Sequence, residues 1–65
     1  MEYSKILKQI REKLFLTQQE LAEKLGVSFS SINRWETGKN KPSMKGKKKI
    51  TDLVKRVKLE VKDHD

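Results

Sequence analysis

Four residues near the middle of the chain have side chains that can recognise nucleobases and share one side of a short predicted helix. They are Phe29, Ser30, Asn33 and Arg34. A helix advances about 100° per residue, which places this group opposite Ile32 and Trp35. In the major groove, arginine pairs with guanine, asparagine pairs with adenine, and serine or an aromatic ring meets polar edges or the thymine methyl group. A solvated helix face is the competing interpretation, but a phenylalanine beside an arginine on a basic chain favours base recognition.

The stretch from Thr17 to Gly38 contains the elements that would position these side chains. Thr17 and Glu20 have the spacing of a capping box, which predicts the start of a first helix. Gly26 predicts a left-handed end to that helix, Ser28 is a good N-cap for a second one, and Gly38 predicts its end. The residues expected to face the core are Leu21, Ala22, Leu25, Val27, Ile32 and Trp35. This layout is that of a helix-turn-helix, whose second helix lies in the major groove of DNA.

Two stretches of the chain resemble a known family. Residues 16–22 (Leu-Thr-Gln-Gln-Glu-Leu-Ala) and 34–43 (Arg-Trp-Glu-Thr-Gly-Lys-Asn-Lys-Pro-Ser) are similar to the lambda-repressor-like, or Cro/repressor (XRE-type), helix-turn-helix proteins of bacteria and phages. The resemblance extends over residues 4–57 approximately. It implies an all-α bundle of four or five helices that binds specific double-stranded DNA sequences. The implied activity is transcriptional regulation of the repressor type, by occupancy of an operator.

The resemblance also implies roles for individual residues. Base-facing positions fall to Phe29, Ser30, Asn33 and Arg34, and positions near the DNA backbone fall to Gln18, Ser28, Thr37, Lys39 and Lys41. In that family an arginine in the first helix often pairs with a glutamate that ends the recognition helix, which Arg11 and Glu36 match. A structural pair is therefore expected, and the alternative is that Arg11 touches a phosphate.

The charge balance agrees with a polyanionic partner. The chain has 16 Lys and Arg against 9 Asp and Glu, a net charge of +7 in 65 residues. Binding to a polyanion gains free energy from released counterions, so we expect salt-dependent affinity for DNA. A run of lysines follows the predicted recognition helix: Lys39, Lys41, Lys45, Lys47, Lys48 and Lys49. Two interpretations of its later four members remain equally open, a phosphate clamp and a solvated helix face.

The length allows one domain, expected to span residues 1–65, and helical periodicity recurs outside the motif. A first helix is predicted over 4–14, with Phe15 and Leu16 entering the core after it. A last helix is predicted with Ser43 as N-cap, although Gly46 weakens its first turn and favours a start near Lys47. Its apolar stripe comprises Ile50, Leu53, Val54 and Val57, with Val61 as a further candidate. Residues 62–65 are expected to fray.

Catalysis has little support in the sequence. His64 is the single histidine and there is no cysteine, so neither a metal site nor a cofactor is expected. With no apolar run long enough to span a membrane, the chain is expected to be cytoplasmic. Other hypotheses are a DNA-targeting domain of a larger DNA-modifying protein, a DNA-binding antitoxin, and a protein-interaction module anchored by Phe29. A weak homodimer on DNA, seeded by Leu59 with Met44 or Val61, is a further hypothesis.

Overall fold

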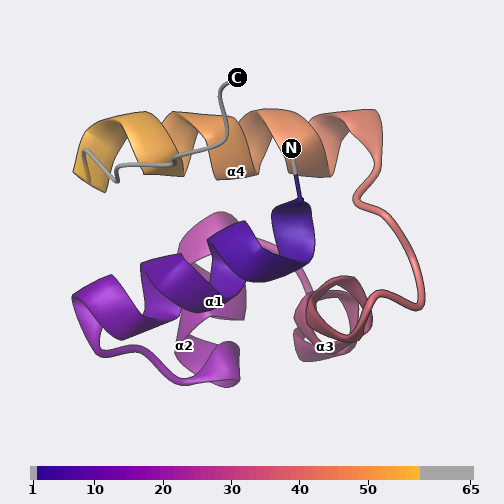
Figure 1. The fold of residues 1–65 in the computed structure, drawn as a ribbon, viewed down its shortest axis with the longest axis horizontal. Helices are drawn as coiled ribbons and strands as arrows, with labels where there is room; N and C mark the ends of the chain where they lie inside the picture. The colour runs from indigo at the N-terminus through magenta and orange to yellow at the C-terminus, as the bar shows by residue number, and fades with distance from the viewer. Residues whose placement is uncertain (1, 58–65) are drawn as a thin grey trace.

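A computed structural model describes residues 2–57 of the protein, which form four helices joined by short connections (Figure 1). The helices are α1 (Tyr3–Leu14), α2 (Gln18–Leu25), α3 (Phe29–Thr37) and α4 (Met44–Val57). Within these described residues no strand occurs. The predicted all-α class is therefore confirmed.

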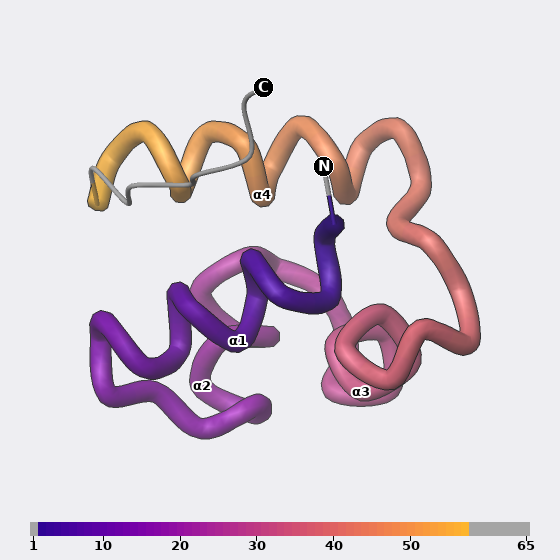
Figure 2. Tube along the Cα trace, in the orientation of Figure 1, coloured from indigo at the N-terminus to yellow at the C-terminus, as the bar shows by residue number. Residues whose placement is uncertain are grey.

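Helices α1 and α2 form the base on which the other two helices pack. Both α3 and α4 contact α1 and α2. In the orientation of Figure 2, α4 runs along the top with α1 beneath it, and α3 is seen almost end-on at the lower right. The loop between α3 and α4 runs up the right-hand edge, so that the two helices reach the shared core from different directions.

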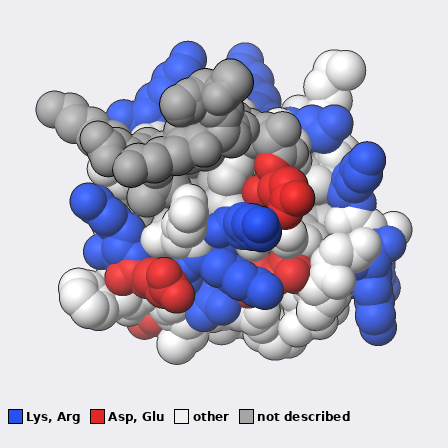
Figure 3. Space-filling model, viewed as in Figure 1, with Lys and Arg blue, Asp and Glu red and all other residues white. Residues whose placement is uncertain are grey.

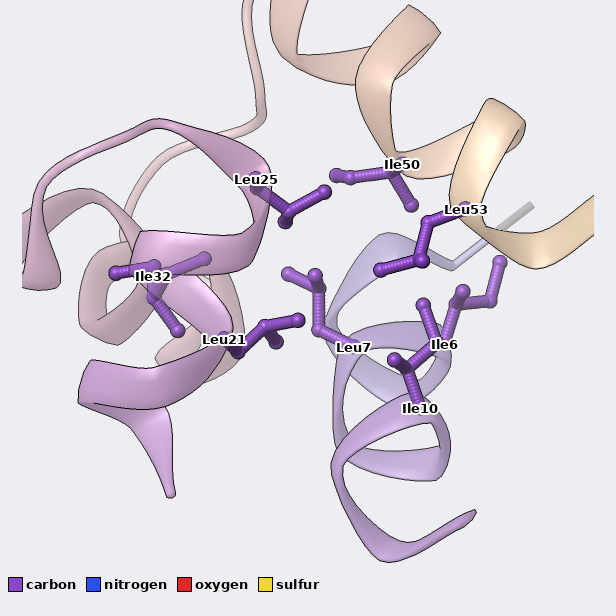
Figure 4. Close-up of a cluster of buried hydrophobic side chains, with 9 residues drawn as sticks. Ile6, Leu7, Ile10, Leu21, Leu25, Ile32, Ile50 and Leu53 are labelled. Carbon is purple, nitrogen blue, oxygen red and sulfur yellow. The ribbon is translucent and has the colours of Figure 1, made fainter. Parts of the chain in front are cut away.

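The core is formed by apolar side chains from all four helices (Figure 4). Its buried members are Ile6, Leu7, Ile10, Leu21, Ala22, Leu25, Ile32, Ile50 and Leu53. Trp35, Leu14, Leu16, Val27 and Val54 are among the partly buried residues that pack against it. The apolar positions expected from helical spacing thus meet in one cluster, and burial of this apolar surface is the main force that holds the helices together.

The predicted boundaries of α2 and α3 are confirmed. The Thr17 hydroxyl accepts from the Glu20 amide at 3.0 Å, and the Glu20 carboxylate accepts from the Thr17 amide at 2.8 Å, which completes the capping box. The Ser28 hydroxyl accepts from the Ser31 amide at 3.1 Å at the start of α3. Gly26 and Gly38, with φ of 72° and 80°, end α2 and α3 in the left-handed conformation.

The expectation that Phe15 enters the core is wrong. Phe15 follows α1 in the left-handed conformation, with φ of 57°, and its side chain is 92% exposed. Leu16 next to it is half-buried and does pack against the core. Sequence periodicity does not reveal a left-handed conformation at a residue other than glycine. This conformation at Phe15 directs the ring away from the core. A left-handed residue with a Cβ atom costs about 1–2 kcal/mol.

The prediction of Ser43 as the N-cap of α4 is confirmed, whereas the later start near Lys47 that Gly46 favours is wrong, because the helix begins at Met44. The Ser43 hydroxyl accepts from the Gly46 amide at 3.2 Å and caps this first turn. Gly46 is buried, and a Cβ atom there would lie 2.9 Å from the Trp35 ring. Gly46 therefore lets α4 approach Trp35 closely. The packing gained by this approach offsets the low helix propensity of glycine.

Some sequence-based expectations fall on residues outside the described range. They are the contributions of Leu59 and Val61, His64, and the fraying of residues 62–65. Met44, the described member of the hypothetical homodimer patch, is 87% exposed.

Candidate nucleic-acid interface

One side of α3 carries exposed side chains with the chemistry for base recognition. Ser30 and Arg34 are exposed, Phe29 is 46% exposed, and Asn33 is half-buried. All four come from nine consecutive helical residues, so their relative positions are fixed by the helix. The exposed side chains remain available to a partner that approaches α3 from solvent.

The opposite side of α3 is anchored in the protein. Ile32 is fully buried in the core, and Trp35 packs against the core with its ring end next to Gly46 of α4. The division of the helix into an exposed and an inward side agrees with the helical spacing of the sequence. A helix held in this way presents its outer residues without needing to move.

An ion pair connects α1 to the end of α3. Arg11 donates from Nε to Glu36 Oε2 at 2.8 Å and from Nη2 to Glu36 Oε1 at 2.9 Å. The Glu36 side chain is 2% exposed and that of Arg11 is 27% exposed. Bidentate geometry of this kind is the strong form of an arginine–carboxylate contact. The pair fixes the C-terminal turn of α3 relative to α1.

The two charges of this ion pair stabilise each other. The hydrogen bond to Glu36 raises the pKa of Arg11 above its usual value. Burial alone would raise the pKa of Glu36, but hydrogen bonds from Arg11 and Gln18 outweigh the burial and hold that pKa below its usual value. Glu36 therefore remains a carboxylate at neutral pH, despite being the buried charged group in the described part of the chain.

Gln18 extends this pair into a chain of hydrogen bonds that the sequence did not reveal. Its Nε2 donates to Glu36 Oε1 at 3.0 Å, and its Oε1 accepts from Asn33 Nδ2 at 3.3 Å. We call Arg11, Glu36, Gln18 and Asn33 the polar relay. The four residues come from three different helices, and the spacing of amide side chains alone carries no signal of such a contact. The phosphate contact implied for Gln18 stays a prediction.

The residues expected near the DNA backbone lie at the two ends of α3 and just beyond it. Ser28 and Thr37 are exposed, and their hydroxyls take part in local contacts: Ser28 Oγ lies 2.9 Å from Ser31 Oγ, and Thr37 donates to the Arg34 carbonyl at 3.2 Å. Lys39 and Lys41 are exposed in the loop that follows. This loop thus places two exposed cations directly after the C-terminal end of α3.

Among the four helices, α4 carries the largest number of positive charges. Its cations are Lys45, Lys47, Lys48, Lys49, Lys55 and Arg56, against a single acid, Asp52. Figure 3 shows basic side chains along the upper and right-hand edges of the molecule, over α4 and the loop before it. Lys47 lies with its Nζ 5.9 Å from the centre of the Tyr3 ring, within the range of a cation–π contact. The remaining cations of α4 are exposed.

Two other kinds of site do not occur in the described residues. Residues 2–57 contain no group of three or more histidine, cysteine, aspartate or glutamate side chains placed to hold a metal ion. None of their helices is long and apolar enough to cross a membrane.

Comparison with known proteins agrees with the geometry of α2 and α3. Residues 7–45 match the model of the helix-turn-helix family. Together with the fold, this match shows that the chain belongs to the lambda-repressor-like (XRE-type) helix-turn-helix family of DNA-binding transcriptional regulators. The predicted family is therefore confirmed.

A curated relative carries the same type of domain. Over 51 residues the chain is 45% identical to the HTH-type transcriptional activator BcrR of Enterococcus faecalis. The alignment covers 78% of this chain and 25% of the relative, so the chain spans about a quarter of the length of that protein. No solved structure gives a significant match to the chain.

Proposed function

We propose that this protein binds specific sequences of double-stranded DNA with α3 in the major groove, and regulates transcription by occupying an operator. The observation that carries the proposal is the two-sided environment of α3. Ser30 and Arg34 are exposed, whereas Ile32 and Glu36 on the other side are buried. A helix that reads bases needs both properties, since its readers must reach the groove and its backbone must hold them in register.

Contacts to the DNA backbone would fix the register of α3. Lys39 and Lys41 are exposed immediately after the helix, and Ser28 and Gln18 lie at the starts of α3 and α2. The amide groups at the N-terminus of a helix favour phosphate contacts, because they are not used within the helix. Such contacts add affinity for every sequence and orient the base readers.

Two effects on transcription are compatible with operator occupancy. Repression follows when the operator overlaps the promoter and the bound protein blocks access to it. Activation is the second candidate, because a curated relative is named as a transcriptional activator. Transcription in vitro from a promoter that carries the selected operator separates the two: repression lowers the transcript yield, and activation raises it.

The chain also fits the role of a DNA-targeting domain within a larger regulatory protein. The observation that favours this role is the length of the relative, of which the chain spans about a quarter. Pairing of two copies on DNA would place half-sites about 34 Å apart. A symmetric operator would support pairing, and a single half-site would support a monomer.

Selection of bound duplexes from a random DNA pool, at two salt concentrations, tests the proposal. We expect enrichment of one sequence motif at both concentrations, with weaker overall binding at the higher salt because counterion release is then less favourable. Recovery of a random population at both salt concentrations would contradict sequence-specific binding.

Two substitutions separate base reading from backbone contact. Arg34→Ala should reduce discrimination at one base pair by about 1–3 kcal/mol, because it removes a bidentate pair of hydrogen bonds to guanine. Lys39→Ala should weaken binding to all sequences alike and flatten the salt dependence. Titrations of each variant with the selected duplex and with random duplex measure both effects. Equal decreases in affinity for both duplexes in Arg34→Ala would remove its assignment as a base reader.

A further inference from the structure

We infer that Gln18 is a positioning residue, which holds the side-chain amide of Asn33 in the orientation that recognises adenine. This inference rests on the proposed function of α3 and deepens it, since it names a preferred base and the residue that enforces the preference. The role is additional to the backbone contact proposed for Gln18, which would add affinity but would carry no sequence information.

The carboxylate of Glu36 sets the orientation of the Gln18 side-chain amide. This carboxylate accepts two hydrogen bonds from Arg11, at 2.8 and 2.9 Å, and one from Gln18 at 3.0 Å. An ionised carboxylate only accepts hydrogen bonds. Gln18 must therefore turn its NH₂ group toward Glu36, because its amide oxygen in that place would face a buried anionic oxygen. The buried charge thus selects one of the two amide orientations of Gln18.

The Gln18 amide in turn sets the orientation of the Asn33 side-chain amide. With its NH₂ group on Glu36, Gln18 presents Oε1 to Asn33, and an amide oxygen only accepts. The Asn33 Nδ2 atom lies 3.3 Å from this oxygen. Rotation of the Asn33 amide by half a turn would bring two oxygens together and break the hydrogen bond. Asn33 is half-buried, so water is less able to replace that bond.

The fixed amide matches one purine better than the other. After the bond to Gln18, Asn33 still has one N–H and its Oδ1 atom available. Adenine presents an acceptor at N7 and a donor at N6, which this pair complements. Guanine presents two acceptors, N7 and O6, and would require two donors. Because the second N–H of Asn33 is directed to Gln18, guanine is left with one unmatched acceptor.

A double-mutant cycle on the selected operator tests the inference. Each base pair of the operator is changed in turn between A·T and G·C, and the ratio of the two dissociation constants is measured. Asn33→Ala should lower the preference for adenine at one position by about tenfold or more, because it removes a bidentate pair of hydrogen bonds. Gln18→Met keeps the length of the side chain but removes both hydrogen bonds, and should lower the preference at the same position by about fivefold. In the Asn33→Ala background, Gln18→Met should have no further effect on the ratio.

Gln19→Met is the matched control. Gln19 neighbours Gln18 on α2, but it is exposed and donates only to Glu23, at 3.3 Å. Its substitution should leave the preference for adenine unchanged. A gain-of-function variant adds an independent readout: Asn33→Asp removes the donor and should move the preference toward cytosine, whose N4 group donates to a carboxylate.

Several outcomes would overturn the inference while leaving the proposed function intact. One is a Gln18→Met variant that weakens binding to all duplexes equally and leaves the ratio unchanged, as expected if Gln18 contacts a phosphate without orienting Asn33. Another is a full fivefold effect of Gln18→Met in the Asn33→Ala background. If the wild-type protein shows no sequence preference, the proposed function fails instead. The relay is then judged by NMR of the Asn33 side-chain NH₂ group: a shift in Gln18→Met but not in Gln19→Met supports it, and no shift contradicts it.

Discussion

Helices α3 and α4 both pack on α1 and α2, but they present opposite kinds of surface to solvent. Helix α3 has one cation, Arg34, and its one acid, Glu36, is buried in an ion pair. Helix α4 has six cations and one acid, and all six cations are exposed. Sequence information requires donors and acceptors in fixed places, whereas attraction to a polyanion requires only charge. Under the proposed function, the density of positive charge does not locate the surface that reads DNA.

The two helices are also held by different interactions. The C-terminal turn of α3 is fixed by the polar relay, while α4 is fixed by apolar packing that includes the contact between Gly46 and Trp35. Polar contacts impose direction, which suits a helix whose side chains must meet particular atoms. Apolar packing imposes distance alone, which suits a helix that contributes charge.

The largest effect on stability is expected from loss of the ion pair between Arg11 and Glu36, which fixes the C-terminal turn of α3. Arg11→Met leaves the Glu36 carboxylate buried with Gln18 as its hydrogen-bond partner, and should lower the free energy of unfolding by about 3 kcal/mol at neutral pH. This is the low end of the range for a broken buried pair, because Arg11 is partly exposed. Urea unfolding followed by circular dichroism measures the decrease. The matched control is Lys5→Met, which breaks an exposed pair with Glu2 and should cost less than about 0.5 kcal/mol.

The same ion pair predicts a dependence on pH. In the wild-type protein the pKa of Glu36 is lowered, so its stabilisation is present above the unfolded value of about 4.3 and is lost as the pH falls through the folded value. Without Arg11, burial disfavours the carboxylate, and protonation relieves that cost as the pH falls. The difference in stability between wild type and Arg11→Met should therefore narrow from pH 7 to pH 4. A constant difference would show that Arg11 stabilises the fold by packing and not by charge.

An intermediate effect on stability is expected from a change in the contact between Gly46 of α4 and Trp35. Gly46→Ala should destabilise the protein by about 1–2 kcal/mol, because overpacking against Trp35 exceeds the gain in helix propensity. The chain has a single tryptophan, so its fluorescence reports the displacement directly. Met44→Ala, at an exposed position in the same turn, is the control and should change stability by less than about 0.5 kcal/mol. A more stable Gly46→Ala variant would contradict the packing role of this glycine.

The smallest effect on stability and base preference is expected from the charges of α4. The double substitution Lys48→Gln and Lys55→Gln should leave both nearly unchanged, since the two side chains are exposed. If α4 contacts phosphates, the slope of log affinity against log salt should decrease by about 0.9 for each phosphate that is no longer neutralised. An unchanged slope would assign Lys48 and Lys55 to a solvated face of α4. A change in base preference would contradict the proposal that α3 recognises bases while α4 contributes only positive charge.

Much of this fold was predictable because its signals are local. Thr17, Glu20 and Ser28 cap helices through neighbours within three residues, and Gly26 and Gly38 end helices through their own conformations. The inward stripe of α3 followed from helical spacing. These features depend on one helix or turn at a time, so the sequence is enough to place them.

The features that sequence analysis missed depend on contacts between distant elements or on an unusual conformation. The sequence shows Gly46 only as a residue that weakens a helix start, because its contact with Trp35 forms only in the folded chain. The contacts of Gln18 to Glu36 and Asn33 arise where α2 meets α3, and no local pattern in the sequence indicates them. The apolar side chain of Phe15 predicts a core position, but its left-handed backbone conformation leaves the ring exposed.

The caps on α2 and α3 have a consequence for how quickly the domain assembles. The boundaries of α2 and α3 are specified by residues close in sequence. These two helices can therefore form and meet before α1 and α4 dock on them. Helical domains rich in short-range contacts fold in microseconds to milliseconds. We therefore expect heat-unfolded protein to regain its native state rapidly on cooling, without the delay that disulfide formation imposes on chains that contain cysteine.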